Sequence, residues 1–194
     1  MTKKIILIGD PGVGKTSLRR RIMGEGFTST YLSTIGADFA IKTLTIGEKI
    51  HKFQVWDLAG QVFFKGVRAT YFKGVDGSII VYDVSRRPTL DHLVDWFTEL
   101  MKYGYFTNNS YSNKKIPIVI VGNKIDLRNQ YKEAISAEEA NIVLDKIKGF
   151  YARLNLNLDI KYIETSALLD VNTQNAFEAL VNMMIVLDTK KNEL

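Results

Sequence analysis

The chain has 194 residues, of which 46% are apolar and 24% charged, and its formal net charge is +5. These values fit one ordinary globular domain, and the lack of cysteine excludes a disulfide scaffold, a cysteine metal site and a prenyl or palmitoyl anchor. Because no apolar run could span a membrane, no nucleic-acid-binding motif occurs and the basic residues are scattered, we expect a cytoplasmic protein that does not bind nucleic acid.

The first apolar run, residues 5–8, predicts a strand that leads into Gly9-Asp10-Pro11-Gly12-Val13-Gly14-Lys15-Thr16. This stretch matches the phosphate-loop pattern G-x-x-x-x-G-K-[ST], and a helix expected over 17–23 completes the context that the pattern requires. A chance glycine-rich turn would not explain that context. Lys15 would reach the β- and γ-phosphates, and the Thr16 hydroxyl suits Mg²⁺. The predicted phosphate-binding residues of this stretch are Gly12, Val13, Gly14, Lys15, Thr16 and Ser17.

After this helix, the sequence predicts a connecting loop followed by a β-hairpin. Residues 24–36 are polar and contain glycine, whereas 37–44 and 50–56 alternate between apolar and polar, with Gly47 at the turn between them. This alternation is typical of two antiparallel strands. A short helical stretch is expected over 63–72.

Asp57 stands where the second hairpin strand ends, in the run Asp57-Leu58-Ala59-Gly60-Gln61. A carboxylate at this edge can hold Mg²⁺ directly or through water. Its alternative role is a helix N-cap. The presence of Thr16 at the same edge favours the metal role.

Two continuous apolar runs, 78–82 and 116–121, predict buried parallel strands. Pro88 opens the helix between them, and residues 103–115 predict a polar surface loop. The core face of the helix is expected to be Leu93, Trp96, Phe97, Leu100 and Met101.

The C-terminal part predicts two helices around one more strand. Ser136 and Glu139 form a capping box for the first helix, 160–163 form the strand, and Asn172 caps the last helix. Its buried face is expected to be Ala176, Phe177, Leu180, Met184 and Leu187.

The alternation of strands and helices indicates one α/β domain with a mostly parallel sheet. Four polar motifs, at 9–16, 57–61, 123–126 and 165–167, each follow a predicted strand. Because the carboxyl ends of parallel strands form the ligand crevice of an open sheet, we expect these motifs to meet in one site.

Asn123-Lys124-Ile125-Asp126 is the candidate reader of the base. A carboxylate such as that of Asp126 can accept from two adjacent N–H groups, which guanine offers and adenine does not. A mismatch of this kind costs roughly 10⁴-fold. Asn123 can bond the imidazole side of the base, and the Lys124 stem can lie along the ring.

With these motifs in view, the chain resembles the Ras superfamily of small GTPases from residue 3 to about 187. The runs Thr34-Ile35-Gly36-Ala37-Asp38-Phe39, Trp56 to Gln61 and Val81-Tyr82-Asp83-Val84 are most similar to the Rab branch. The resemblance implies the P-loop NTPase (small GTPase) fold, a six-stranded, mostly parallel sheet with one antiparallel strand and about five helices. It also implies a single GTP-binding domain over 1–190, with a short tail over 191–194.

The resemblance further implies residue roles and Mg²⁺ with GTP or GDP as ligands. Thr34 would close on Mg²⁺ and the γ-phosphate in the first of two nucleotide-gated switch segments. Gly60 would give its N–H to that phosphate, Gln61 would orient the attacking water, and Phe27 would pack on the base. The catalytic set is Gln61, Lys15 and Thr34, and the metal set is Thr16, Thr34 and Asp57. The guanine set is Phe27, Asn123, Lys124, Asp126, Ser166, Ala167 and Leu168, in which the Ala167 N–H meets the guanine oxygen.

Three positions depart from the family pattern: Pro11 in the phosphate loop, Val62 in place of an acidic residue, and Leu168 in place of a lysine. Pro11 and Val62 bear on stimulation by activating proteins. No C-terminal cysteine occurs, so we expect no lipid anchor in this chain.

We therefore expect a GTP-binding switch that hydrolyses GTP slowly, with effector, exchange-factor and activating proteins as partners at the switch segments. The protein would be a monomer that reaches membranes through its partners. The alternative is a nucleotide-binding interaction module with negligible turnover, which Pro11 favours and which Gln61 and Thr34 oppose. A P-loop kinase is a third possibility, but the chain has no arginine-rich lid segment and its guanine motif argues against it.

Overall fold

The computed structural model describes residues 2–28, 34–107, 110–111, 115–156 and 158–192. Its centre is a six-stranded sheet in the order β2-β3-β1-β4-β7-β8. Every neighbouring pair is parallel except β2 and β3, which form the expected hairpin. The strands are β1 (Thr2–Ile8), β2 (Ala37–Ile46), β3 (Lys49–Leu58), β4 (Gly77–Asp83), β7 (Ile118–Asn123) and β8 (Ile160–Thr165).

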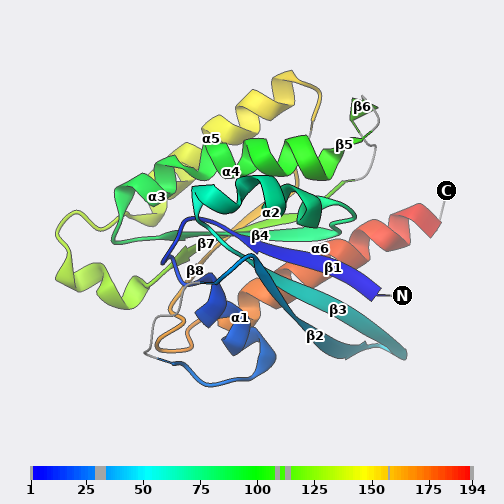
Figure 1. Ribbon diagram of the computed structural model, residues 1–194, viewed down its shortest axis with the longest axis horizontal. Helices are drawn as coiled ribbons and strands as arrows, with labels where there is room; N and C mark the ends of the chain where they lie inside the picture. The colour runs from blue at the N-terminus through cyan, green and yellow to red at the C-terminus, as the bar shows by residue number, and fades with distance from the viewer. Residues whose placement is uncertain (1, 29–33, 108–109, 112–114, 157, 193–194) are drawn as a thin grey trace.

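Helices cover both faces of this sheet (Figure 1). One layer contains α2, α3, α4 and α5, and the other contains α1 and α6. This arrangement confirms the predicted three-layer small GTPase fold. The helices are α1 (Lys15–Met23), α2 (Lys65–Phe72), α3 (Arg87–Asp91), α4 (Leu93–Leu100), α5 (Ala137–Arg153) and α6 (Thr173–Asn192).

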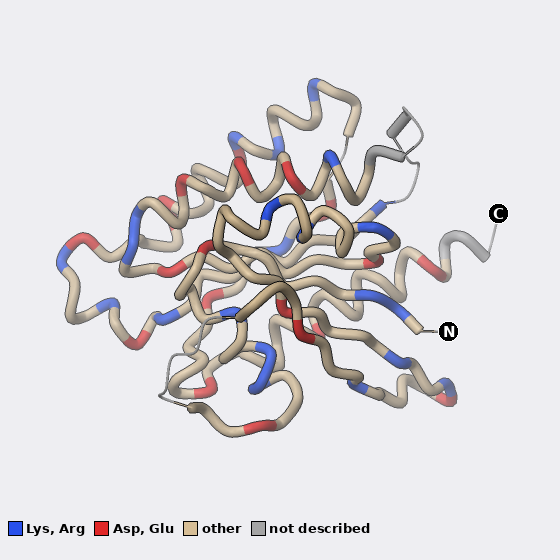
Figure 2. Tube along the Cα trace, viewed as in Figure 1, with Lys and Arg blue, Asp and Glu red and all other residues tan. Residues whose placement is uncertain are grey.

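The apolar runs of the central strands explain the two cores. Successive side chains of a strand point to opposite faces, so an unbroken apolar run supplies both. In β1, Ile6 and Ile8 pack under α2 to α5, whereas Ile5 and Leu7 pack under α1 and α6. Outside these apolar strands, acidic and basic residues are interspersed along the chain (Figure 2), as the scattered charges of the sequence indicate.

The helix expected after Pro88 is present but is divided at His92 into α3 and α4. This break gives six α-helices among the described residues, where about five helices were expected. All five residues of the predicted core face are buried. The predicted capping box of Ser136 and Glu139 is confirmed at the start of α5.

Two local predictions differ from the structure. Part of the expected 103–115 loop is anchored, because Tyr105 is buried and its hydroxyl bonds both the N–H and the carbonyl of Ile116 at 2.8 Å. The one-turn helix Met101–Tyr105 and the short β5 (Phe106–Thr107) and β6 (Ser110–Tyr111) also lie here; 108–109 and 112–114 are outside the described residues. Asn172 does precede α6, but its side-chain amide donates to the Glu164 carbonyl.

Candidate functional site

A cavity of about 370 Å³ opens at the carboxyl edge of the sheet. Strand register explains its position, because Leu7 lies beside Asp57 and Asn123 lies beside both Asp83 and Thr165. The four polar motifs therefore meet here, as predicted. The predicted residues that line the cavity are Gly12, Gly14, Lys15, Thr16, Ser17, Phe27, Thr34, Gly60, Gln61, Asn123, Lys124, Asp126, Ala167 and Leu168.

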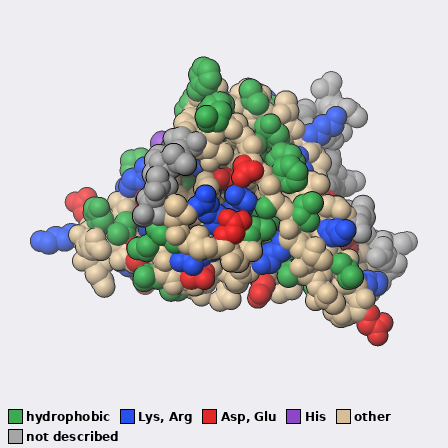
Figure 3. Space-filling view, turned by 60° about the horizontal axis from the view of Figure 1, so that its bottom comes forward, with side chains coloured by type: hydrophobic (Ala, Val, Ile, Leu, Met, Phe, Trp, Pro, Cys, Tyr) green, Lys and Arg blue, Asp and Glu red, His purple; other side chains and the backbone are tan. Residues whose placement is uncertain are grey.

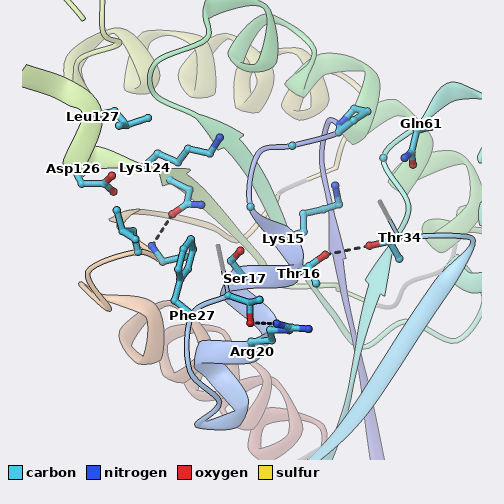
Figure 4. Close-up of a pocket in the computed structure, with 18 residues that line it drawn as sticks. Lys15, Thr16, Ser17, Arg20, Phe27, Thr34, Gln61, Lys124, Asp126 and Leu127 are labelled. Atoms are coloured by element: carbon cyan, nitrogen blue, oxygen red, sulfur yellow. Dashed lines mark hydrogen bonds between the residues drawn. The ribbon is translucent and has the colours of Figure 1, made fainter. Parts of the chain in front are cut away.

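Figure 4 shows how the cavity is organised along its length. Asp126 and Lys124 lie at one end, Thr34 and Gln61 at the other, and Lys15 and Thr16 between them. This spacing suits an extended ligand with different chemistry at its two ends. The sequence predictions missed three lining residues, Arg20, Thr28 and Leu127.

The loop between β1 and α1 has the geometry of a phosphate cradle. Gly12 and Gly14 have φ of 74° and 100°, in the left-handed region that favours glycine. A Cβ at Gly14 would lie 2.3 Å from Asn123 Nδ2, so only glycine fits between the two segments. Val13 does not line the cavity; it is buried, and its carbonyl accepts from Asn123 Nδ2 at 2.9 Å.

Lys15 is held over this loop. Its ammonium donates to the carbonyls of Gly9 and Asp10 at 2.8 and 2.9 Å. Burial lowers the pKa of Lys15 to about 8, because a charged group loses hydration in the interior. An anion in the cavity would restore favourable interactions with this charge. The first helical N–H groups of α1 face the same space.

Asp57 forms an oxygen cluster with two hydroxyls. Its Oδ2 accepts from Thr16 Oγ1 at 2.5 Å and from Thr34 Oγ1 at 3.2 Å, and the two hydroxyl oxygens are 3.1 Å apart. Asp57 is fully buried, and burial raises its pKa. Its Oδ1 has no hydrogen-bond partner among the described residues. These three hard oxygen donors and one unpaired carboxylate oxygen fit Mg²⁺.

Three or more His, Cys, Asp or Glu side chains do not gather anywhere in the described part of the chain. This observation is compatible with Mg²⁺, which takes few protein ligands and completes its shell with phosphate oxygens and water.

The other end of the cavity joins two loops. Asn123 Oδ1 accepts from Thr165 Oγ1 at 2.9 Å and from the Ala167 N–H at 3.1 Å. Because it also bonds to Val13, the Asn123 side chain connects its own motif with the 9–16 and 165–167 motifs. The Ser166 hydroxyl donates to Asp126 Oδ1, which explains why Ser166 supports the site without lining the cavity.

Asn123 and Ala167, both predicted to contact guanine, also contact other parts of the protein. The Ala167 N–H is bonded to Asn123, and one of the two side-chain N–H groups of Asn123 is bonded to Val13. Lys124 lines the cavity, and its ammonium pairs with the buried Asp83 at 2.7 Å.

Helix α4 contacts both the phosphate loop and the segment after β3. Trp96 Nε1 donates to Asp10 Oδ1 at 2.8 Å, and the Arg68 guanidinium stacks over the Trp96 ring at 4.5 Å. Arg68 is buried, pairs with Glu99 in two bonds of 2.8 and 3.0 Å, and donates to the Ala59 carbonyl at 2.7 Å. The sequence analysis assigned Trp96 to the core alone, although a buried indole N–H usually needs an acceptor.

The catalytic candidate Gln61 is positioned by its backbone. Its carbonyl accepts from Arg68 Nη1 at 3.2 Å, whereas its buried Oε1 has no hydrogen-bond partner in the described residues. A Cβ on Gly60 would lie 2.5 Å from the Gly9 carbonyl oxygen, so the Gly60 backbone lies directly against the phosphate loop. The Gln61 Oε1 therefore has an acceptor position beside the phosphate loop that none of the described residues uses.

His92 is predicted to titrate above the usual range of histidine. Its Nδ1 is 2.7 Å from Asp10 Oδ2, and this hydrogen bond raises the pKa of His92, with Asp91 and Asp95 adding to the effect. The protonated form is therefore favoured in the folded state. Its contribution to stability is full below the unfolded pKa of about 6.5 and is lost as pH rises through the higher folded pKa.

An NMR titration of His92 checks this prediction. Asp10→Asn should lower the pKa of His92 toward the usual value, because the carboxylate charge is lost. His51 on β3, titrated in the same spectra, reports any change that is common to the whole protein. An unchanged His92 titration in Asp10→Asn would contradict the assignment.

Comparison with known proteins connects this geometry to a family. The family model "Ras family" matches residues 4–186. Among curated proteins, the chain is 34% identical to the Ras-related protein RABA4b of Arabidopsis thaliana, over 97% of this chain and 75% of that protein. It is 38% identical to the Ras-related protein Rab-1 of Theileria parva over 93% and 73%, and 36% identical to the Ras-related protein YPT3 of Nicotiana plumbaginifolia over 98% and 78%.

Proposed function

Because the chain belongs to the Ras family and is a Rab-like small GTPase, we propose that it binds GTP and GDP with Mg²⁺ and hydrolyses GTP slowly. The observation that carries this proposal is the single cavity with Asp126 at one end and the oxygen cluster of Thr16, Thr34 and Asp57 at the other. Guanine would lie at the first end and the γ-phosphate at the second.

In the proposed reaction, water attacks the γ-phosphorus in line. The bond from this phosphorus to the β–γ bridging oxygen breaks, and GDP and inorganic phosphate are the products. Lys15 and the loop N–H groups hold the phosphates and neutralise the charge that develops on their oxygens. The unpartnered Gln61 Oε1 accepts a hydrogen bond from the attacking water and so orients it. Thr16 and Thr34, with Asp57 directly or through water, would hold Mg²⁺, which would supply positive charge to the phosphates when bound.

A competition titration with GTP, GDP and ATP tests the choice of base. We expect micromolar or tighter binding of GTP and GDP and little binding of ATP, because adenine leaves the Asp126 carboxylate unpaired. Equal affinity for ATP and GTP would refute guanine recognition while leaving the phosphate site intact.

The second candidate function is a nucleotide-binding interaction module with negligible turnover. Pro11 favours it, because this ring lines the cavity and its position lacks the backbone N–H that other residues would offer to the phosphates. The intact Gln61 and Thr34 favour hydrolysis.

Apolar side chains around the switch segments support the proposal of protein partners there. Phe39 stacks on Trp56 with ring centroids 4.6 Å apart, Trp56 contacts Tyr71 at 5.4 Å, and Phe63 is 90% exposed. Hydrophobic side chains also reach the surface between charged ones on the face in Figure 3. Singly scattered apolar residues are normal on a surface, whereas contiguous aromatic side chains such as Phe39, Trp56 and Tyr71 mark an interaction site. We infer contacts here with effector, exchange-factor and activating proteins.

None of the described helices is long and apolar enough to cross a bilayer. We propose a cytoplasmic monomer that meets membranes through its partners and does not bind nucleic acid. Its GTP-binding domain would extend over 1–190, followed by a tail over 191–194.

A further inference from the structure

An ion pair behind the base end of the cavity links the two loops that carry Asp126 and Ser166. Arg128 lies two residues after Asp126, and Glu164 lies two residues before Ser166. The guanidinium donates from Nη1 to Glu164 Oε2 at 2.9 Å and from Nη2 to Glu164 Oε1 at 2.6 Å. The two segments are therefore joined twice, through Ser166 on the cavity side and through this pair behind it.

The segment that carries Asp126 has few other attachments. It is a single 3₁₀ stretch, η3 (Ile125–Gln130), and it contains no buried residue. Hydrogen bonds in such a helix have poorer geometry than those of an α-helix. Ile125 is half-buried against the core, and Arg128 Nη2 also donates to the Ile135 carbonyl at 3.0 Å. Arg128 thus adds an attachment for the segment that carries Asp126, beside the Ser166 hydrogen bond and the pair of Lys124 with Asp83.

Glu164 is itself fixed from the core side. Tyr162 Oη donates to Glu164 Oε1 at 2.9 Å, and Tyr82 Oη lies 2.8 Å from Tyr162 Oη. Tyr82 is fully buried in β4, so this chain of hydrogen bonds connects Glu164 to the middle of the sheet. The hydrogen bonds from Arg128 lower the pKa of Glu164, which keeps the carboxylate charged at neutral pH.

The geometry points to a specificity role: we propose that Arg128 and Glu164 are positioning residues that hold Asp126 where it can accept from the 2-amino group of guanine. The inference rests on the proposed function, since it concerns how the base is read. A partly exposed ion pair such as this one adds little to overall stability, but a bidentate pair that anchors a short segment controls where that segment lies.

Equilibrium titrations with GDP and with IDP, which lacks the 2-amino group, test this role. We expect Arg128→Ala and Glu164→Gln to lower the ratio of IDP to GDP dissociation constants by about three- to tenfold, because a fully formed hydrogen bond to a charged group changes an equilibrium roughly tenfold or more. The loss of affinity should be larger for GDP than for IDP, because hypoxanthine keeps only one of the two N–H groups that Asp126 accepts from. Arg128→Lys, which keeps the charge without the fork, should give an intermediate ratio.

A merely structural role would weaken GDP and IDP equally and leave the ratio unchanged, which would overturn the inference. Arg87→Ala is the matched control, because Arg87 pairs with Glu139 at 2.8 Å on the surface, away from the cavity; an equal fall there would also overturn it. Asp126→Ala distinguishes a failure of the proposed guanine recognition from a failure of the role proposed for Arg128 and Glu164. If it leaves the ratio unchanged, the proposed reading of guanine fails; if it abolishes the preference while the Arg128 and Glu164 variants do not change it, the inference alone fails.

Discussion

In Asp126→Asn, the preference for guanine should be replaced by a preference for xanthine nucleotides. Guanine presents two adjacent N–H donors to the carboxylate, whereas xanthine presents one N–H and one carbonyl oxygen. An amide can accept from the first and donate to the second. A site built on buried hydrogen bonds rejects the mismatched analogue by roughly 10⁴-fold, so GDP affinity should fall steeply and XDP affinity should rise.

Competition titrations of GDP against XDP measure this exchange directly. The matched control is Asp145→Asn, which makes the same chemical change at a 76% exposed side chain on α5. The control should keep the wild-type preference. Retention of the GDP preference by Asp126→Asn would show that another group reads the base.

Gln61→Leu should reduce intrinsic GTP hydrolysis by about a hundredfold or more while sparing nucleotide binding. The side chain keeps a similar length, but the oxygen that orients the attacking water is lost, and groups that act on the reacting water contribute about 10²–10⁴-fold. Gln61 makes no side-chain hydrogen bond through Oε1 to the described residues, so the substitution removes no structural contact there.

Single-turnover hydrolysis of labelled GTP, with the GDP dissociation constant measured beside it, checks this prediction. An unchanged rate in Gln61→Leu would favour the interaction module with negligible turnover. A fall in nucleotide affinity as large as the fall in rate would place Gln61 in binding, and the assigned mechanism would be wrong.

The sequence predicted those parts of the molecule in which local pattern and long-range packing agree. The apolar runs of β1, β4 and β7 are buried on both faces, as expected for central strands of a parallel sheet that is covered by helices on both sides. Motifs that follow parallel strands meet at one edge of the sheet. Most of the residues that line the cavity could be predicted from this rule.

Contacts that join residues distant in sequence could not be predicted in this way. Trp96 and Asp10 are 86 positions apart, and Arg128 and Glu164 are 36 apart, so no spacing rule connects them. Their pairing depends on which helix packs over which loop. The division of the helix at His92 and the burial of Tyr105 also depend on tertiary packing, which overrides the polar composition of the segment after α4.

Gly122 in β7 faces the two phenols that support Glu164. A Cβ at this position would lie 2.7 Å from Tyr82 Oη and 2.9 Å from Tyr162 Oη, closer than side-chain atoms approach in practice. Substitutions at Gly122, Tyr82 and Tyr162 are therefore not independent of one another. A larger residue at 122 becomes acceptable only after one tyrosine has lost its hydroxyl or its ring, whereas the reverse order passes through a destabilised chain. The packing around Gly122 thus sets the order in which substitutions can be accepted, and the effect of any one substitution depends on which residues already stand at the other two positions.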